Sequence, residues 1–146
     1  PANVGGAGLV TVRDLVRQAL RMRPGRLVIG EVRGAEVVDL LAALNTGHEG
    51  GCGTVHANGP TAVPARLEAL GVAAGLTREA VHSQLASGLQ AVVHLDRHHH
   101  GERRVKDIAV VDSDSRGLVR VVSAVAVQGE RLAKGPGSDL LAELLQ

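Results

Sequence analysis

Two stretches of this sequence combine residue types that could do chemistry. In the first, the apolar run at residues 27–29 is followed by Gly30 and Glu31. An apolar run that ends in a carboxylate is typical of a buried parallel strand, and open α/β sheets bind their ligands at the carboxyl ends of such strands. In the second, His48 and His56 flank a glycine-rich turn. An imidazole can donate a hydrogen bond to a phosphate oxygen, and its pKa responds to that anion.

The pattern around these stretches predicts the helices and strands that position them. Thr11 is expected to N-cap a first helix, with Asp14 completing a capping box. A strand is expected at residues 27–32, a second helix after Gly34, and a short strand at 53–57. The helical side chains expected to face the core are Val12, Leu15, Val16, Ala19, Leu20, Val37, Leu40, Leu41 and Leu44.

The second half of the chain predicts more strands. The expected elements are a helical segment around residues 66–70, a helix at 77–87, strands at 89–95, 105–111 and 118–127, and a terminal helix at 139–145 capped by Ser138. A polar turn that includes residues 98–101 separates the first two strands and indicates a hairpin. The fold class is therefore α/β, with parallel strands flanked by helices and an antiparallel hairpin at the edge. We expect one unit at 1–134, followed by a linker and terminal helix at 135–146.

The composition limits the class of protein. Hydrophobic residues make up 45% of the chain, yet Phe, Tyr and Trp are absent, so the core must be aliphatic. A net charge of +1 gives no sign of a nucleic-acid or membrane binder. No apolar run approaches the length of a membrane span, and the single cysteine excludes an intramolecular disulfide. These features predict a cytoplasmic protein.

The two stretches together resemble the Walker B motif (residues 26–34) and the histidine box (residues 46–57) of the type II/type IV secretion ATPases. The likeness begins at the first residues and takes in both motifs, and a weaker likeness reaches about Arg104. The tight-adherence (Flp) pilus branch fits best. The resemblance implies the carboxyl-terminal part of a RecA-like P-loop ATPase domain. It also implies a hexameric motor that hydrolyses ATP for pilus assembly, conjugal transfer or secretion.

The resemblance also implies roles for individual residues. Glu31 would be the catalytic carboxylate that holds Mg²⁺ through water. Thr54 and His56, which point the same way on their strand, would contact the nucleotide, and His56 would sense its γ-phosphate. His48 would have either a catalytic role or a structural hydrogen bond to the turn. The ligands implied are ATP and Mg²⁺.

Arg33 and Glu36 are expected to support the nucleotide site, either by pairing with each other or by binding the neighbouring loop. No P-loop can be drawn, because neither Lys106 nor Lys134 follows a glycine. We therefore expect a piece of a longer ATPase that is inactive by itself. The partners implied are further copies of the protein in a ring and inner-membrane platform proteins, at the inner face of the cell membrane, with no direct contact to nucleic acid.

Two other functions remain open from the residues alone. The chain could be a non-enzymatic interaction module of a secretion apparatus. It could also be a zinc enzyme, because His48, Cys52 and His56 are spaced four apart, although the glycines between them make a helix improbable there. The histidines at 98–100 are expected to form a solvated hairpin tip. The arginine stripe of the first helix (Arg13, Arg17 and Arg21) indicates either a solvated face or a subunit contact.

Overall fold

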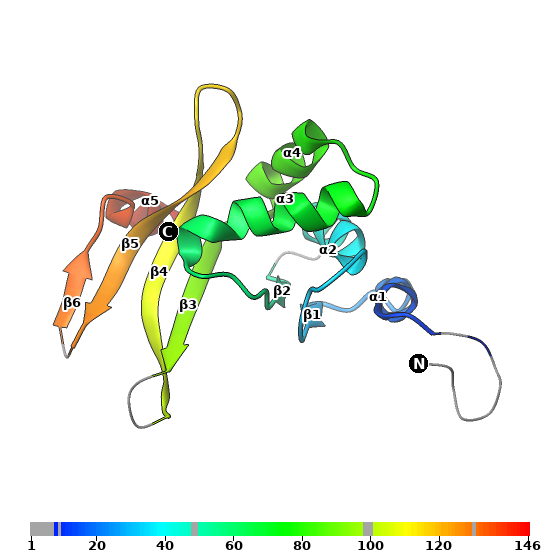
Figure 1. Cartoon of the computed structure of the whole chain (residues 1–146), viewed down its shortest axis with the longest axis horizontal. Helices are drawn as coiled ribbons and strands as arrows, with labels where there is room; N and C mark the ends of the chain where they lie inside the picture. The colour runs from blue at the N-terminus through cyan, green and yellow to red at the C-terminus, as the bar shows by residue number, and fades with distance from the viewer. Residues whose placement is uncertain (1–7, 9, 48–49, 98–100, 130) are drawn as a thin grey trace.

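The computed structural model describes residues 8, 10–47, 50–97, 101–129 and 131–146. A short parallel pair of strands is packed with helices, and a four-stranded antiparallel sheet lies beside them (Figure 1). The elements are α1 (Val12–Arg21), β1 (Val28–Ile29), α2 (Glu36–Leu44), β2 (Cys52–Gly53), the 3₁₀ turn η1 (Pro60–Ala62), α3 (Val63–Ala73), α4 (Arg78–Gly88), β3 (Ala91–Arg97), β4 (Arg103–Ser113), β5 (Val119–Gln128), β6 (Arg131–Lys134) and α5 (Ser138–Leu144). The mixed α/β class with parallel and antiparallel strands is as predicted.

Helix α1 begins where its capping box predicts. The Thr11 N–H donates to Asp14 Oδ2 at 2.9 Å, and the Asp14 N–H donates to Thr11 Oγ1 at 3.1 Å. The prediction for its core face was only partly right. Val16 is buried, but Val12 and Leu15 are exposed, because α1 packs mainly against α2 and one edge of its apolar stripe fills that contact.

The basic stripe of α1 turns toward α2. Arg13 Nε lies 2.6 Å from Asp39 Oδ2, and Arg17 Nε lies 2.9 Å from Asp39 Oδ1. Two of the three arginines therefore form ion pairs within the chain and tie α1 to α2.

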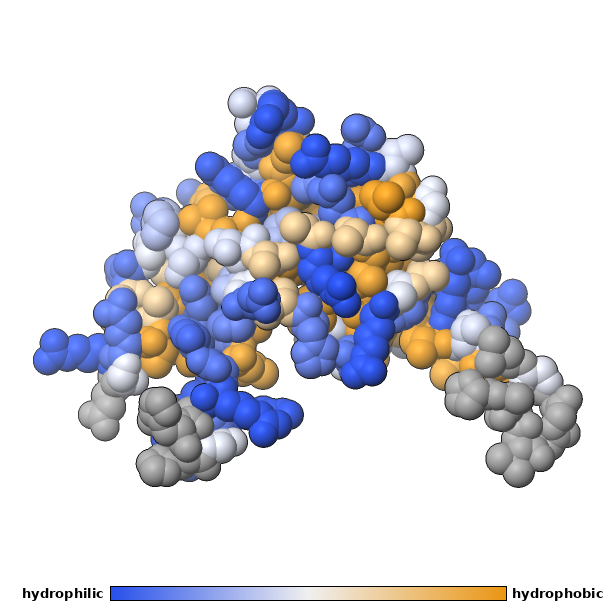
Figure 2. Space-filling view, in the orientation of Figure 1, coloured by the Kyte–Doolittle hydropathy of each residue, from blue (hydrophilic) through white to orange (hydrophobic). Residues whose placement is uncertain are grey.

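The aliphatic core lies between the helices and one face of the antiparallel sheet. Its buried members include Val37, Leu41, Val81 and Leu85. Helices α3 and α4 approach closely because Gly71 has no side chain: a Cβ there would lie 2.5 Å from a methyl carbon of Val81. On the face shown in Figure 2, apolar and small residues gather over the helical part, and hydrophilic residues follow the lower edge.

Strands β1 and β2 are shorter than the predicted ranges of 27–32 and 53–57. Among the described residues each pairs only with the other, so the ladder has no third strand to extend it. Val28, the second residue of the predicted strand, is 70% exposed, whereas Leu27 and Ile29 on either side of it are buried, so only one face of the pair packs on the core.

The antiparallel sheet has the order β3-β4-β5-β6. The hairpin of β3 and β4 is confirmed. Strand β6 was missed, because the sequence indicated only a linker after the third predicted strand. That linker is itself packed: the Gly135 N–H donates to the carbonyl of Ala124, and the Gly137 N–H donates to that of Ser123, both at 2.9 Å. Ser138 is not the cap of α5, since Gly137 occupies that position without a side-chain bond.

A buried histidine joins the sheet to the helices. His82 of α4 accepts the Val119 N–H at its Nδ1 (2.9 Å) and places Nε2 2.9 Å from Glu68 Oε2 of α3. Arg78 Nε donates to the same carboxylate oxygen at 3.2 Å. We call His82, Glu68 and Val119 the histidine clasp.

Among the helices described, none has the length and apolarity that a membrane crossing needs.

Candidate functional site

Glu31 follows β1 after a single residue, Gly30, at the carboxyl end of the parallel pair. The chain on either side of it continues to pair with the segment after β2. The Thr54 N–H donates to the Ile29 carbonyl at 3.2 Å, and the Val32 N–H donates to the Thr54 carbonyl at 2.8 Å. This places the carboxylate beside residues 54–56, at the point where a strand meets a loop.

Two basic side chains converge on Glu31. Arg33 Nε forms an ion pair with its Oε1, and His56 Nε2 lies 2.9 Å from the same oxygen. The Glu31 side chain is 25% exposed, whereas that of His56 is 83% exposed. The acid is thus held in place, while the imidazole lies in solvent and can exchange partners.

The charge on Glu31 follows from its neighbours. The Arg33 guanidinium beside it, helped by His56, holds the pKa of the Glu31 carboxyl below its ordinary value of 4.5, although burial opposes the shift. The carboxylate is therefore ionised at neutral pH. An ionised carboxylate at the end of a strand is suited to hold a hydrated divalent cation.

Thr54 and His56 share a side of the chain, as predicted. Both are exposed, whereas Val55 between them packs against the core. The Thr54 hydroxyl donates to the Gly30 carbonyl, so it braces the loop that carries Glu31. His48, the other histidine predicted for the site, lies outside the described residues.

Glu36 turns back to hold the loop after Glu31. Its Oε1 accepts the Arg33 N–H at 2.6 Å and the Gly34 N–H at 2.9 Å. Burial alone would raise the pKa of Glu36, but these backbone N–H groups outweigh it and hold the pKa below 4.5. Of the two roles expected for Arg33 and Glu36, the mutual ion pair does not form: Arg33 pairs with Glu31, and Glu36 binds the loop.

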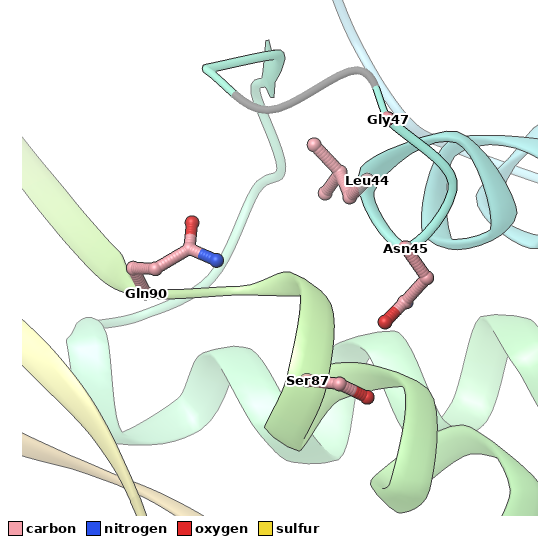
Figure 3. Close-up of a pocket in the computed structure, with 5 residues that line it drawn as sticks. All are labelled: Leu44, Asn45, Gly47, Ser87 and Gln90. Atoms are coloured by element: carbon pink, nitrogen blue, oxygen red, sulfur yellow. The ribbon is translucent and has the colours of Figure 1, made fainter.

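A second feature was not predicted from the sequence. A hollow of about 440 Å³ lies between the end of α2 and the start of β3, and Leu44, Asn45, Gly47, Ser87 and Gln90 line it (Figure 3). The Asn45 amide donates to the carbonyl of Leu41, at the end of α2, and to a carbonyl of α4, at 2.8 and 3.0 Å. In the sequence, Asn45 after a helical pattern indicated only where α2 ends. It did not indicate the hydrogen bond from Asn45 to α4.

The described residues give no support to the hypothesis of a zinc site. No three His, Cys, Asp or Glu side chains in the described ranges come together as a metal site. Cys52 is exposed on β2. Magnesium does not require such a group, because it is commonly held by one or two carboxylates together with water and phosphate oxygens.

Comparison with known proteins decides the family. A family model described as "Type II/IV secretion system protein" matches residues 2–140. The chain belongs to this family. The assignment made from the two motifs is therefore confirmed.

Named relatives agree with the family. The chain is 65% identical over 122 residues to a Mycobacterium tuberculosis protein whose name assigns it provisionally to conjugal transfer, and the match covers 84% of this chain and 34% of the relative. It is 32% identical over 103 residues to the conjugal transfer protein TrbB of Rhizobium radiobacter (70% and 31%). The chain thus spans about a third of the length of the curated relatives it matches.

A solved structure resembles the fold. The VirB11 ATPase of the Brucella suis type IV secretion system, crystallised with sulphate, superposes with a TM-score of 0.61 at 28% identity. The match covers 68% of this chain and 31% of that one.

Proposed function

We propose that the chain is the carboxyl-terminal part of a RecA-like ATPase domain whose parent protein hydrolyses ATP in a hexameric ring. The ring would drive conjugal transfer, secretion or pilus assembly at the cytoplasmic face of the inner membrane, with platform proteins there as partners; for the pilus system we favour the tight-adherence branch. The observation that carries the proposal is the ionised Glu31 at the carboxyl end of β1, paired with Arg33 and His56. Family membership and the VirB11 likeness support it.

Glu31 is the Walker B acid in this proposal, within residues 26–34. Its carboxylate fits a hydrated Mg²⁺, because it is ionised and three-quarters enclosed while leaving one side open to solvent. Bound Mg²⁺ would supply balancing charge for the transferring phosphoryl group. Arg33 would keep the carboxylate ionised and oriented. Glu36 would hold the loop that carries both.

His56 is the nucleotide sensor in this proposal, within the histidine box at residues 46–57. It pairs with Glu31 from an exposed position, so a phosphate oxygen could replace the carboxylate as its partner. A contact that forms with ATP and not with ADP shifts the population of conformations. Thr54 would position the loop, and His48 remains a candidate second histidine.

The organisation of the sheet supports a longer domain. Strand β2 pairs only with β1, and β3 pairs only with β4, among the described residues. Each strand therefore has a free edge, and one further strand from the parent protein between them would join both sheets into one. In this proposal residues 1–134 belong to the ATPase domain, and 135–146 follow it as linker and terminal helix.

The first test is Glu31→Gln in the parent protein. The change keeps the shape but removes the charge, so we expect ATP hydrolysis to fall at least about tenfold while ATP binding is largely retained, since the lost interaction acts in the transition state. Glu79→Gln, a matched change at an exposed position of α4, should leave turnover unchanged. Near-normal turnover in the Glu31 variant would disprove the Walker B assignment.

The second test uses the 146-residue chain alone. Most ATP affinity in P-loop folds comes from the backbone N–H groups of that loop and the helix after it. Because the sequence has no glycine–lysine pair, we expect no ATPase activity and at most millimolar Mg²⁺-ATP binding, about −4 kcal/mol or weaker. Calorimetry measures this directly, and micromolar affinity would contradict the proposal.

A further inference from the structure

The two faces of the antiparallel sheet are covered very differently. One face packs on the helices: Val92, Val111 and Val119 point that way and join the core. We call the opposite side the outer face. Helix α5 covers one half of it, since a Cβ at Gly137 would lie 2.8 Å from a methyl carbon of Val110. In Figure 1, α5 lies behind the sheet and α3 crosses in front of it.

The other half of the outer face has no cover among the described residues. Strand pairing places ten side chains there, which we call the open half-face: Val93, Leu95, Arg97, Arg103, Val105, Ile108, Val125, Val127, Leu132 and Lys134. Seven of the ten are aliphatic, and several of these are largely exposed, Leu132 at 74%. Stacked sheets and helices normally bury such a surface.

The charges of the open half-face have one sign. Its three polar members are the cations Arg97, Arg103 and Lys134, and the structure gives none of them an ion pair with a described residue. On the opposite side of the same hairpin the cations are paired, as in Lys106 with Asp96 at 2.8 Å. The open half-face is therefore suited to an occupant that carries carboxylates on an apolar helix or strand.

Helix α5 presents that chemistry on the same outer face. Leu141 is half-buried toward the sheet, and Asp139 and Glu143, two positions before and after it, lie about 200° around the helix and are exposed. The side of α5 that stands away from its own sheet is thus acidic. Leu140 and Leu144 flank it and are also exposed.

We propose that the open half-face binds α5 of a second copy of this chain in a two-fold symmetric dimer, a contact separate from the head-to-tail contacts of the ring proposed above. The two-fold axis would lie in the layer that holds α5 and would run perpendicular to the strands. Rotation about it places the half of the outer face that α5 covers in one copy against the open half-face of the other. Each α5 then lies between two sheets, and Asp139 and Glu143 meet the cations of the partner. Such an interface is self-complementary, as two-fold contacts must be.

The charges on α5 also decide between a second copy and an anionic membrane. The open half-face alone, apolar and basic, would suit phospholipid. However, the carboxylates of α5 stand out from the same face and would meet an anionic bilayer first, at a cost in electrostatic repulsion. In the dimer the same carboxylates are attracted to the surface they meet.

The test is sedimentation of the 146-residue chain over a range of concentrations, with two double variants. One reverses the acids (Asp139→Lys with Glu143→Lys), and the other reverses the cations (Arg103→Glu with Lys134→Glu). Each double variant alone should self-associate at least tenfold more weakly than the unaltered chain. Mixed together they should form a heterodimer, because the reversed positions of each variant then meet the opposite charge on its partner. High salt should weaken the dimer of the unaltered chain and the heterodimer, because it screens the attraction in both.

Arg131→Glu is the matched control, because Arg131 lies on the same strand as Lys134 but points to the other face. It should leave association unchanged, and circular dichroism checks the fold of each variant. A chain that stays monomeric at every concentration would overturn the proposal. So would a dimer insensitive to both reversals, or binding to phosphatidylglycerol vesicles, absent with phosphatidylcholine, in a chain that does not self-associate.

Discussion

The part of the chain that carries Glu31 and the part that carries the histidine clasp are held together in different ways. The parallel pair has two paired residues in each strand, and its charged side chains interact in or near solvent. The antiparallel sheet has long ladders, a buried core beneath it and a buried imidazole that joins it to two helices. The difference indicates that the proposed chemistry depends on charge placement on a loop with few backbone pairs, whereas the histidine clasp is fixed by long ladders and by burial.

The largest expected effect is a loss of stability when a buried side chain is shortened, compared with the same kind of change at an exposed position. Leu85 of α4 is fully buried in the core, and Val28 of β1 is mostly exposed. Leu85→Ala should lower the free energy of unfolding by about 2–5 kcal/mol, through lost burial and the cavity left behind. Val28→Ala should change it by no more than about 0.5 kcal/mol. Urea denaturation measures both, and equal losses would contradict the comparison.

The histidine clasp should come next. His82→Ala removes the acceptor of the Val119 N–H inside the protein and leaves that donor without a partner, which should cost about 1–3 kcal/mol. Hydrogen exchange should show faster opening of β5. His94→Ala, a half-buried histidine of β3 without a described hydrogen bond, is the control and should have a smaller effect. A similar loss for both variants would mean that the clasp adds nothing beyond packing.

Glu36 tests how the loop near the site is held. Glu36→Gln weakens two charge-assisted bonds to backbone N–H groups and should cost about 1 kcal/mol at neutral pH. Because folding lowers the pKa of Glu36, its contribution is present above the ordinary value of 4.5 and is lost as the pH falls through the lower, folded value. The difference between the variant and the unaltered chain should therefore shrink in acid. A constant difference across that range would exclude the carboxylate as its source.

The smallest effect on stability is expected at His56. Because its side chain is mostly in solvent, His56→Ala should leave the free energy of unfolding of this chain nearly unchanged. In the parent protein the same change should reduce the conformational difference between the ATP-bound and ADP-bound forms, and lower turnover. If the variant distinguishes the two nucleotides as well as the parent does, His56 has only a structural role.

The sequence predicted the elements whose signals are local. The capping residue Thr11 and the hairpin of β3 and β4 depend on near neighbours, and the structure confirms both. Strand β6 has only four residues and no alternating pattern long enough to detect. The exposure of Leu15 and the short length of β1 depend on which elements pack beside them. The periodicity of apolar residues carries no information about those neighbours.

The candidate site divides in the same way. The strand-end position of Glu31 and the shared side of Thr54 and His56 followed from spacing. The pairing of Arg33 with Glu31 and the turn of Glu36 back to the loop did not, because each depends on a side-chain orientation with two plausible partners. The spacing of Glu36, three residues after Arg33 at the start of the loop, is the signal that could have indicated the bond from its carboxylate to the backbone.

The histidine clasp has a spectroscopic consequence. Since Nδ1 of His82 accepts the Val119 N–H, the ring must be neutral with its proton on Nε2, where Glu68 accepts it. A protein without Phe, Tyr or Trp has no aromatic ring currents except those of its histidines. Methyl groups near the enclosed His82 ring should therefore give displaced proton resonances in an otherwise unshifted aliphatic spectrum. Those resonances would serve as a built-in reporter of whether the sheet is docked on the helices.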